Sequence, residues 1–222
     1  MVKVYLRPGN QFDKVSANFN AGEFFCHCGK CNPQKIDDDL VTALQRIRTM
    51  TGTNVHVNCG YRCPKHNAEV GGSPKSQHME GKAADIRNSA ILPVVYAQLA
   101  ELDGMQGIGL YNTFTHLDVR AGKKYKGYWG NGKKCLGYPA TFFLTVKKGM
   151  KNADCNLKMP IVSAAQYMLN LNGADLKIDG SFGEASDKAL RAFQSSHGLK
   201  VDGLCGSKTW KELYKIWTGK VV

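Results

Sequence analysis

The stretch SPKSQHMEGKAADIR, residues 73–87, places a histidine and an aspartate seven positions apart, with small residues between them. His78 and Asp85 both offer atoms that bind zinc well, and Gly81 can adopt a positive φ that lets the backbone turn tightly. A catalytic zinc takes three protein ligands and leaves one position to water. His116 is the best third candidate, since it shares one face of a predicted strand with Phe114 and Asp118. The fold must then bring these three side chains together.

The same residues also have a purely structural interpretation. A lone histidine is more often a hydrogen-bonded core or surface residue, and Asp85 can cap a segment or pair with Lys82. The remaining histidines lack comparable neighbours, so we expect them to be structural or exposed: His27, His56, His66 and His197.

The overall composition indicates a globular protein with an affinity for anionic polymers. The chain has 222 residues, of which 43% are hydrophobic, and a formal net charge of +12. This charge predicts attraction to nucleic acid, an anionic membrane surface or the acidic bacterial cell wall. No helix-turn-helix, zinc finger or arginine-rich arm is recognisable, so we expect no nucleic-acid partner.

The N-terminal sequence MVKVYLRPGNQFDK lacks the apolar core of a secretory signal, and no apolar run has the length of a membrane span. We therefore expect synthesis in the cytoplasm without a signal peptide, and no stable membrane insertion. A monomer is the simplest expectation for the oligomeric state.

The eight cysteines are unevenly distributed along the chain. They occur in CHCGKC, in CGYRC and at three later positions, namely Cys135, Cys155 and Cys205. Clustered thiolates suit a structural metal in a reducing compartment, whereas an even number also permits disulfides. The candidate metal ligands are Cys26, Cys28, Cys31 and one of Cys59 or Cys63. Disulfides are the favoured alternative, because the C-x-C start is not a standard zinc-binding spacing.

Hydrophobic periodicity predicts an α+β N-terminal domain over residues 1–130. The expected elements are a helix over 37–50, a strand over 55–59, a loop up to residue 72, a helix over 89–103 with Ser89 as its candidate cap, and two short strands within 106–112 and 114–120. The acidic opening of the first helix and Pro93 near the start of the second suit helix N-termini.

A Gly- and Lys-rich linker over residues 131–150 leads into a second domain, residues 151–222, which contains a repeat. LKIDGSFGEASDKAL from Leu176 returns 23 residues later as LKVDGLCGSKTWKEL. Each copy reads as a D-G turn followed by a short helix, and SAAQYMLNLNG supplies another helix in front. The alternating acids of a calcium loop are missing. The expected second domain is a small all-α three-helix bundle.

Two parts of the chain resemble known families. NCGYRCPKHNAEVGGSPKSQHMEGKAADI together with GIGLYNTFTHLDVR resembles the zinc D-alanyl-D-alanine carboxypeptidase family, over about residues 15 to 129. The family signature S-x-H-x-x-G-x-A-x-D is met at Ser76, His78, Gly81, Ala83 and Asp85. DGSFG, ALRAFQ, GLKVDGLCG and TW resemble the peptidoglycan-binding domain type one.

The resemblance implies an antiparallel-sheet zinc peptidase domain with flanking helices. His78, Asp85 and His116 would bind Zn²⁺. Arg62 would be a catalytic residue that binds substrate near the scissile carbonyl or its terminal carboxylate. Ser76 and Gln77 would line the same wall of the site.

One position departs from the family pattern. Several branches carry a catalytic acid in E-x-x-H, three residues before the third ligand, where this chain has Thr113. Asp118 is the nearest carboxylate to His116, and we favour it as the general base. The alternative is that Asp118 orients His116 through its other ring nitrogen.

The resemblance implies a zinc-dependent peptidoglycan hydrolase that cuts the stem peptide or cross-bridge of bacterial peptidoglycan, with a phage endolysin as the best match. The alternative is a non-catalytic zinc-containing protein that binds the wall or has a structural role. The sequence does not indicate which peptide bond is cut.

Overall fold

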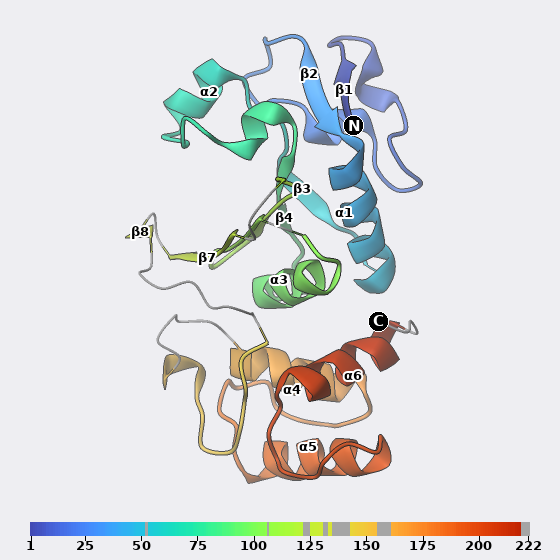
Figure 1. The fold of residues 1–222 in the computed structure, drawn as a ribbon, viewed down its shortest axis with the longest axis vertical. Helices are drawn as coiled ribbons and strands as arrows, with labels where there is room; N and C mark the ends of the chain where they lie inside the picture. The colour runs from blue at the N-terminus through green and yellow to red at the C-terminus, as the bar shows by residue number, and fades with distance from the viewer. Residues whose placement is uncertain are drawn as a thin grey trace. The chain divides into compact units, whose positions relative to one another are not determined.

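The computed structural model describes residues 1–51, 53–105, 107–121, 125–130, 133–134, 143–154 and 161–218. The chain divides into two compact units, Met1–Pro139 and Ala140–Val222, each described here by itself (Figure 1). Half of the predicted linker (131–132 and 135–142) lies outside the described residues, as do Cys135 and Cys155. The predicted domain boundaries therefore stay predictions. No helix within the described ranges has both the length and the apolar character needed to cross a membrane.

The first unit contains a six-stranded sheet with the order β3-β4-β6-β5-β7-β8. Its strands are β3 (His56–Cys59), β4 (Ala83–Arg87), β5 (Gly107–Leu110), β6 (Thr115–Asp118), β7 (Tyr125–Gly130) and β8 (Lys133–Lys134). Neighbouring strands are antiparallel except β5 and β7, which are parallel. Strands β1 (Val2–Tyr5) and β2 (Gln34–Asp37) form a separate antiparallel pair. The predicted α+β class is confirmed, with one parallel pair that was not expected.

Three α-helices accompany these sheets. Among the described residues they are α1 (Asp38–Thr51), α2 (Pro64–Glu69) and α3 (Pro93–Leu102). The short 3-10 turns η1 (Asn10–Phe12) and η2 (Ala21–Phe24) precede α1, and η3 (Gln77–Glu80) lies between α2 and α3. The prediction that Ser89 caps the second helix is wrong, because α3 begins at Pro93 with Leu92 as its N-cap. Proline suits the first helical position since its missing N–H has no intrahelical acceptor there. The segment predicted as a loop before residue 72 contains α2.

Helix α3 packs against β5 and β6 of the sheet, and α1 packs against α3 (Figure 1). The Thr115 hydroxyl donates to the carbonyl oxygen of Pro93 at 2.7 Å, and Leu117 on the same face of β6 is fully buried. Because side chains alternate along a strand, His116 and Asp118 lie on the opposite face of β6. This face carries the candidate site.

The second unit contains the helices α4 (Ile161–Leu171), α5 (Glu184–Ser196) and α6 (Ser207–Thr218), with η4 (Asn152–Asp154) before them. This confirms the predicted all-α domain with three α-helices among its described residues. The last part of the predicted linker packs within this unit, since Val146 pairs with Cys205 and the carbonyl oxygen of Leu144 accepts from Trp210 Nε1 at 2.9 Å.

The sequence repeat corresponds to a repeated hydrogen-bond arrangement. Gln194 of α5 donates to Asp202 Oδ1 at 3.0 Å and accepts from the backbone N–H of Gly203 at 3.0 Å. Gly203 has a φ of +69°, as the D-G turn requires. The first copy makes the same contacts with Gln166, Asp179 and Gly180, at 3.0 and 2.9 Å. A buried glutamine of one helix thus holds the turn that precedes the next helix.

Candidate active site

The strand register gathers several polar side chains into one row across the sheet. Asp85 on β4 is the Cα partner of Cys59 on β3 and of His116 on β6. His116 is in turn the partner of Gly109 on β5, which has no side chain to fill the space. Two of the three predicted metal ligands are therefore neighbours on adjacent strands.

The third predicted ligand, His78, reaches this row from η3. Gly81 ends the turn with a φ of +69°, which confirms the predicted positive φ, and its backbone N–H donates to the carbonyl oxygen of His78. His78 is 1% exposed. Its Nδ1 lies 2.6 Å from the carbonyl oxygen of Gly60. A carbonyl can only accept, so Nδ1 carries the proton and Nε2 faces Asp85 and His116.

The orientation of His116 is fixed in the same way by Asp118. His116 Nε2 donates to Asp118 Oδ2 at 3.0 Å, while Arg120 Nε donates to Asp118 Oδ1 at 2.7 Å. Burial would raise the pKa of Asp118, but these donors hold it well below its usual range. The ionised carboxylate keeps a proton on Nε2, and Nδ1 of His116 faces Asp85 and His78.

Three ligand atoms therefore converge on one point. His116 Nδ1 lies 2.9 Å from Asp85 Oδ1 and 3.1 Å from His78 Nε2, and the last two atoms are 3.4 Å apart. Tetrahedral zinc with bonds of about 2.0 Å places its ligand atoms about 3.3 Å apart. Two imidazoles and a carboxylate are also a donor set that zinc accepts. The geometry and chemistry of this set fit a zinc ion.

When no cation is bound, a proton can lie between His116 Nδ1 and Asp85 Oδ1. Burial would lower the pKa of His116, but hydrogen bonds to Asp118 and Asp85 raise it to about 9. Burial would likewise raise the pKa of Asp85, yet the bonds from His116 and His78 hold it well below its usual range. A bound cation would displace this proton, so metal binding at this site releases acid.

Cys59 also lies near the proposed metal position, and sequence reasoning did not assign it to this site. Its sulfur, His78 and Asp85 offer ligand atoms within 4.8 Å of one another. However, Cys59 Sγ lies 3.9 Å from His78 Nδ1, whose proton is already donated to Gly60. His116 is the better third ligand because it lies on the Nε2 side.

A pocket of about 750 Å³ opens over the three ligand atoms. Six of the seven residues predicted for the site line it: Arg62, Ser76, Gln77, His78, Asp85 and His116. Sequence reasoning missed the other lining residues, among them Lys75, Tyr111, Phe114 and Arg120. The Tyr111 and Phe114 rings stack with centroids 4.1 Å apart and form an aromatic wall. Their spacing in LYNTF is not distinctive without the fold.

Arg62 combines firm attachment with unused hydrogen-bonding capacity. Its backbone N–H donates to the carbonyl oxygen of His78 at 3.1 Å, and its Nη2 lies 3.5 Å from Ser76 Oγ. Its Nε is buried and has no partner among the described residues. A buried donor without an acceptor is costly, so Arg62 is suited to receive an oxygen atom of a ligand.

Asp118, the predicted base, does not line the pocket. It is 0% exposed, and its two oxygens accept from His116 and Arg120. Access to substrate and a free lone pair are what a base needs. The geometry therefore favours the alternative role, in which Asp118 orients His116.

Comparisons with known proteins find matches for both parts of the chain. Residues 17–118 match the family described as Peptidase M15, and residues 158–213 match the one described as putative peptidoglycan binding domain. A zinc D-Ala-D-Ala carboxypeptidase from Streptomyces albus G is 46% identical over 44 residues, which cover 20% of this chain and 17% of the relative. A probable peptidoglycan L,D-endopeptidase, MepK of Haemophilus influenzae, is 31% identical over 103 residues, covering 42% and 55%.

These matches cover less than two thirds of either relative's length. Among solved structures, a Burkholderia AP3 phage endolysin is 41% identical over 32% of this chain and 24% of that chain, with a TM-score of 0.27.

Proposed function

We propose that the chain is a zinc-dependent peptidase of peptidoglycan, because residues 17–118 match the Peptidase M15 family and residues 158–213 match the putative peptidoglycan binding domains. Two matched relatives carry names that support it, a zinc D-Ala-D-Ala carboxypeptidase and a probable peptidoglycan L,D-endopeptidase. The observation that carries the proposal is the convergence of His78, Asp85 and His116 within 3.4 Å at the base of an open pocket.

His78, Asp85 and His116 would hold the zinc ion, each through an atom that already faces the common point. A bound zinc supplies a Lewis acid that polarises a carbonyl and makes water nucleophilic near neutral pH. The protein's part is to keep both imidazoles in the correct tautomer, through Gly60 for His78 and through Asp118 for His116.

Substrate binding falls to the cationic wall of the pocket. Arg62 has an unpaired Nε, and its guanidinium can hold a peptide carbonyl or a terminal carboxylate through charge-assisted hydrogen bonds. Ser76 and Gln77 line the same wall and would contact the peptide backbone. Negative charge that develops on the attacked carbonyl oxygen would be stabilised by Arg62.

The C-terminal unit would tether the peptidase to its insoluble substrate. Tethering raises the local concentration of cleavable bonds without any new contact in the active site. The net charge of +12 adds attraction to an acidic wall. A phage endolysin is the finer assignment that we favour.

Asp118 acts in this proposal as a positioning residue for His116. Replacing Asp118→Asn removes the anionic acceptor that fixes the His116 tautomer, so we expect the zinc dissociation constant to rise about 10- to 100-fold. Competition with a chelating dye measures this constant. Asp103→Asn is the matched control, because Asp103 is an ion-paired carboxylate (to Arg46) away from the pocket. If zinc affinity is unchanged while kcat falls, Asp118 is instead the general base.

The function is tested directly on purified peptidoglycan. We expect the chain to release new peptide termini, to lose this activity after treatment with a chelator and to regain it with added zinc. Mass spectrometry of the released fragments would identify the bond that is cut. A zinc-loaded, folded sample that binds the wall but releases no peptide would support the alternative, a non-catalytic wall-binding protein.

A further inference from the structure

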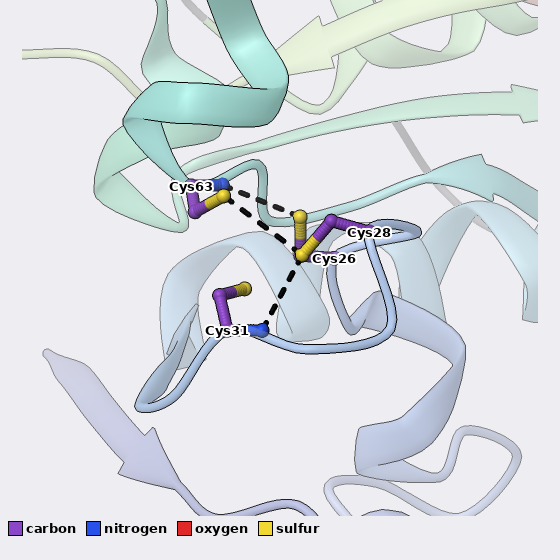
Figure 2. Close-up of side chains that lie close together, drawn as sticks. All are labelled: Cys26, Cys28, Cys31 and Cys63. Atoms are coloured by element: carbon purple, nitrogen blue, oxygen red, sulfur yellow. Dashed lines mark hydrogen bonds between the residues drawn. The ribbon is translucent and has the colours of Figure 1, made fainter.

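Four cysteine side chains outside the pocket lie together in the first unit. Cys26, Cys28 and Cys31 lie in the loop before β2, and Cys63 is the N-cap of α2. Figure 2 shows their sulfur atoms turned toward one another. All four sulfurs lie within 4.8 Å of one another, and those of Cys28 and Cys63 are 3.9 Å apart. Tetrahedral zinc with Zn–S bonds of about 2.3 Å places its sulfurs about 3.8 Å apart.

Each of the four sulfurs also accepts a hydrogen bond from a nitrogen donor. The backbone N–H of Cys63 points to Cys26 Sγ, that of Cys31 to Cys28 Sγ and that of His66 to Cys63 Sγ, each at 3.4 Å. The side-chain amide of Gln34 supplies the fourth, to Cys31 Sγ at 3.4 Å. N–H donors stabilise sulfur most when it is an anionic thiolate. One donor for every sulfur is the surrounding expected of a metal thiolate centre.

Gln34 is held by hydrogen bonds to the cysteine loop, including one from its side-chain amide to the carbonyl oxygen of Cys31. It is fully buried at the start of β2, and its Oε1 accepts from the backbone N–H of Cys26 at 2.8 Å. Its amide therefore links two of the four cysteines and braces the loop between them. Gly29, with a φ of +72°, provides the turn that returns Cys31 toward Cys28.

The disulfide alternative does not fit this arrangement. The six described cysteines are all free, including the four of this cluster. Apart from Tyr61, the local core consists of cysteines, with Cys26 and Cys63 buried and Cys28 and Cys31 packed against them. Four small cysteine side chains bury little apolar surface, whereas a metal held by four thiolates stabilises such a loop strongly.

We propose that Cys26, Cys28, Cys31 and Cys63 bind a second, structural zinc ion, separate from the site at His78. Four protein ligands leave no position for water, which makes the site structural rather than catalytic. His66 Nδ1 lies 3.3 Å from Cys26 Sγ and would donate to this sulfur when Cys26 is a thiolate. Of the two cysteines left open by sequence, Cys63 belongs here and Cys59 does not.

This second site would support the pocket through the segment from Gly60 to Cys63. Within that segment, the carbonyl oxygen of Gly60 accepts the hydrogen bond from His78 Nδ1, and Arg62 lines the pocket. The backbone N–H of Tyr61 donates to the carbonyl oxygen of Phe24 at 2.7 Å, close to the cysteine loop. Loss of the structural zinc is therefore expected to loosen both Arg62 and the support of His78.

Counting zinc in the full chain tests the proposal independently of activity. We expect about two zinc ions per chain in the unaltered protein and about one in the His78→Ala variant, since four-thiolate sites bind zinc tightly. X-ray absorption of the His78→Ala protein should show only sulfur neighbours, at about 2.3 Å. A zinc-free His78→Ala protein that is folded, or one with nitrogen and oxygen neighbours only, would overturn the proposal. So would mass spectrometry that shows disulfides among these cysteines.

Cysteine variants test the proposed ligands of the second zinc site directly. Cys31→Ser should lower the zinc content by about one ion per chain, and Cys31→His should restore it, because histidine is also a zinc ligand. Combined with His78→Ala, the Cys31→His protein should show sulfur and nitrogen neighbours where His78→Ala alone shows only sulfur. Cys205→Ala, in the second unit, is the matched control and should keep both ions. If Cys31→Ser retains both ions, Cys31 is not a ligand and the four-thiolate site is refuted.

Discussion

Replacing His78→Ala should reduce peptide release from peptidoglycan at least about 1,000-fold, which corresponds to about 4 kcal/mol of lost transition-state stabilisation. The substitution removes one of three ligand atoms, His78 Nε2, and leaves only Asp85 and His116 facing the common point. Two remaining ligands do not hold zinc at a defined position. The rate is measured as new amino groups released per enzyme.

His78 is almost completely buried, so its removal can also affect folding. His116→Ala provides a second test, because the His116 side chain is 15% exposed. The matched control is His56→Ala, an exposed histidine on β3, which should retain full activity. Circular dichroism verifies that each variant is folded. A folded His78→Ala or His116→Ala protein with near-normal peptide release would rule out the proposed zinc site.

Sequence spacing and the family resemblance together predicted six of the residues that line the pocket. His78 and Asp85 belong to one short segment, and His116 was selected by alternation along a strand that the structure contains as β6. Their roles as ligands stay predictions until metal binding is measured. The amphipathic helix α1 was also found within one residue at each end, since its apolar period is regular.

Features that depend on contacts between distant segments were not predictable. The role of Asp118 depends on Arg120, whose side chain donates a hydrogen bond to the Asp118 carboxylate. Periodicity also could not distinguish Cys59 from Cys63. The strand β3 directs Cys59 toward His78, and the turn after it carries Cys63 to the cysteine loop. These side-chain positions depend on tertiary packing, which produces no recognisable pattern in the local sequence.

The turn between His78 and Asp85 depends on a glycine for two independent reasons. Gly81 has a φ of +69°, and a Cβ placed on it would lie 2.5 Å from the carbonyl oxygen of Lys35 on β2. Its own carbonyl oxygen accepts from the backbone N–H of Asp37 at 2.9 Å. Any side chain at this position must therefore push β2 and η3 apart.

Gly81→Ala should destabilise the first unit by about 3–5 kcal/mol, the sum of a strained positive φ and a backbone overlap. Gly104→Ala is the matched control, because Gly104 also has a positive φ (+82°) but no atom within 4 Å of the added Cβ. It should cost only about 1–2 kcal/mol. Hydrogen exchange read by mass spectrometry measures both, with peptides of the second unit as an internal reference. In Gly81→Ala, the separation of β2 and η3 should also move His78 and lower peptide release about 100-fold. Equal losses of stability in the two variants would show that β2 yields to the methyl group, and that strain in the turn alone requires glycine.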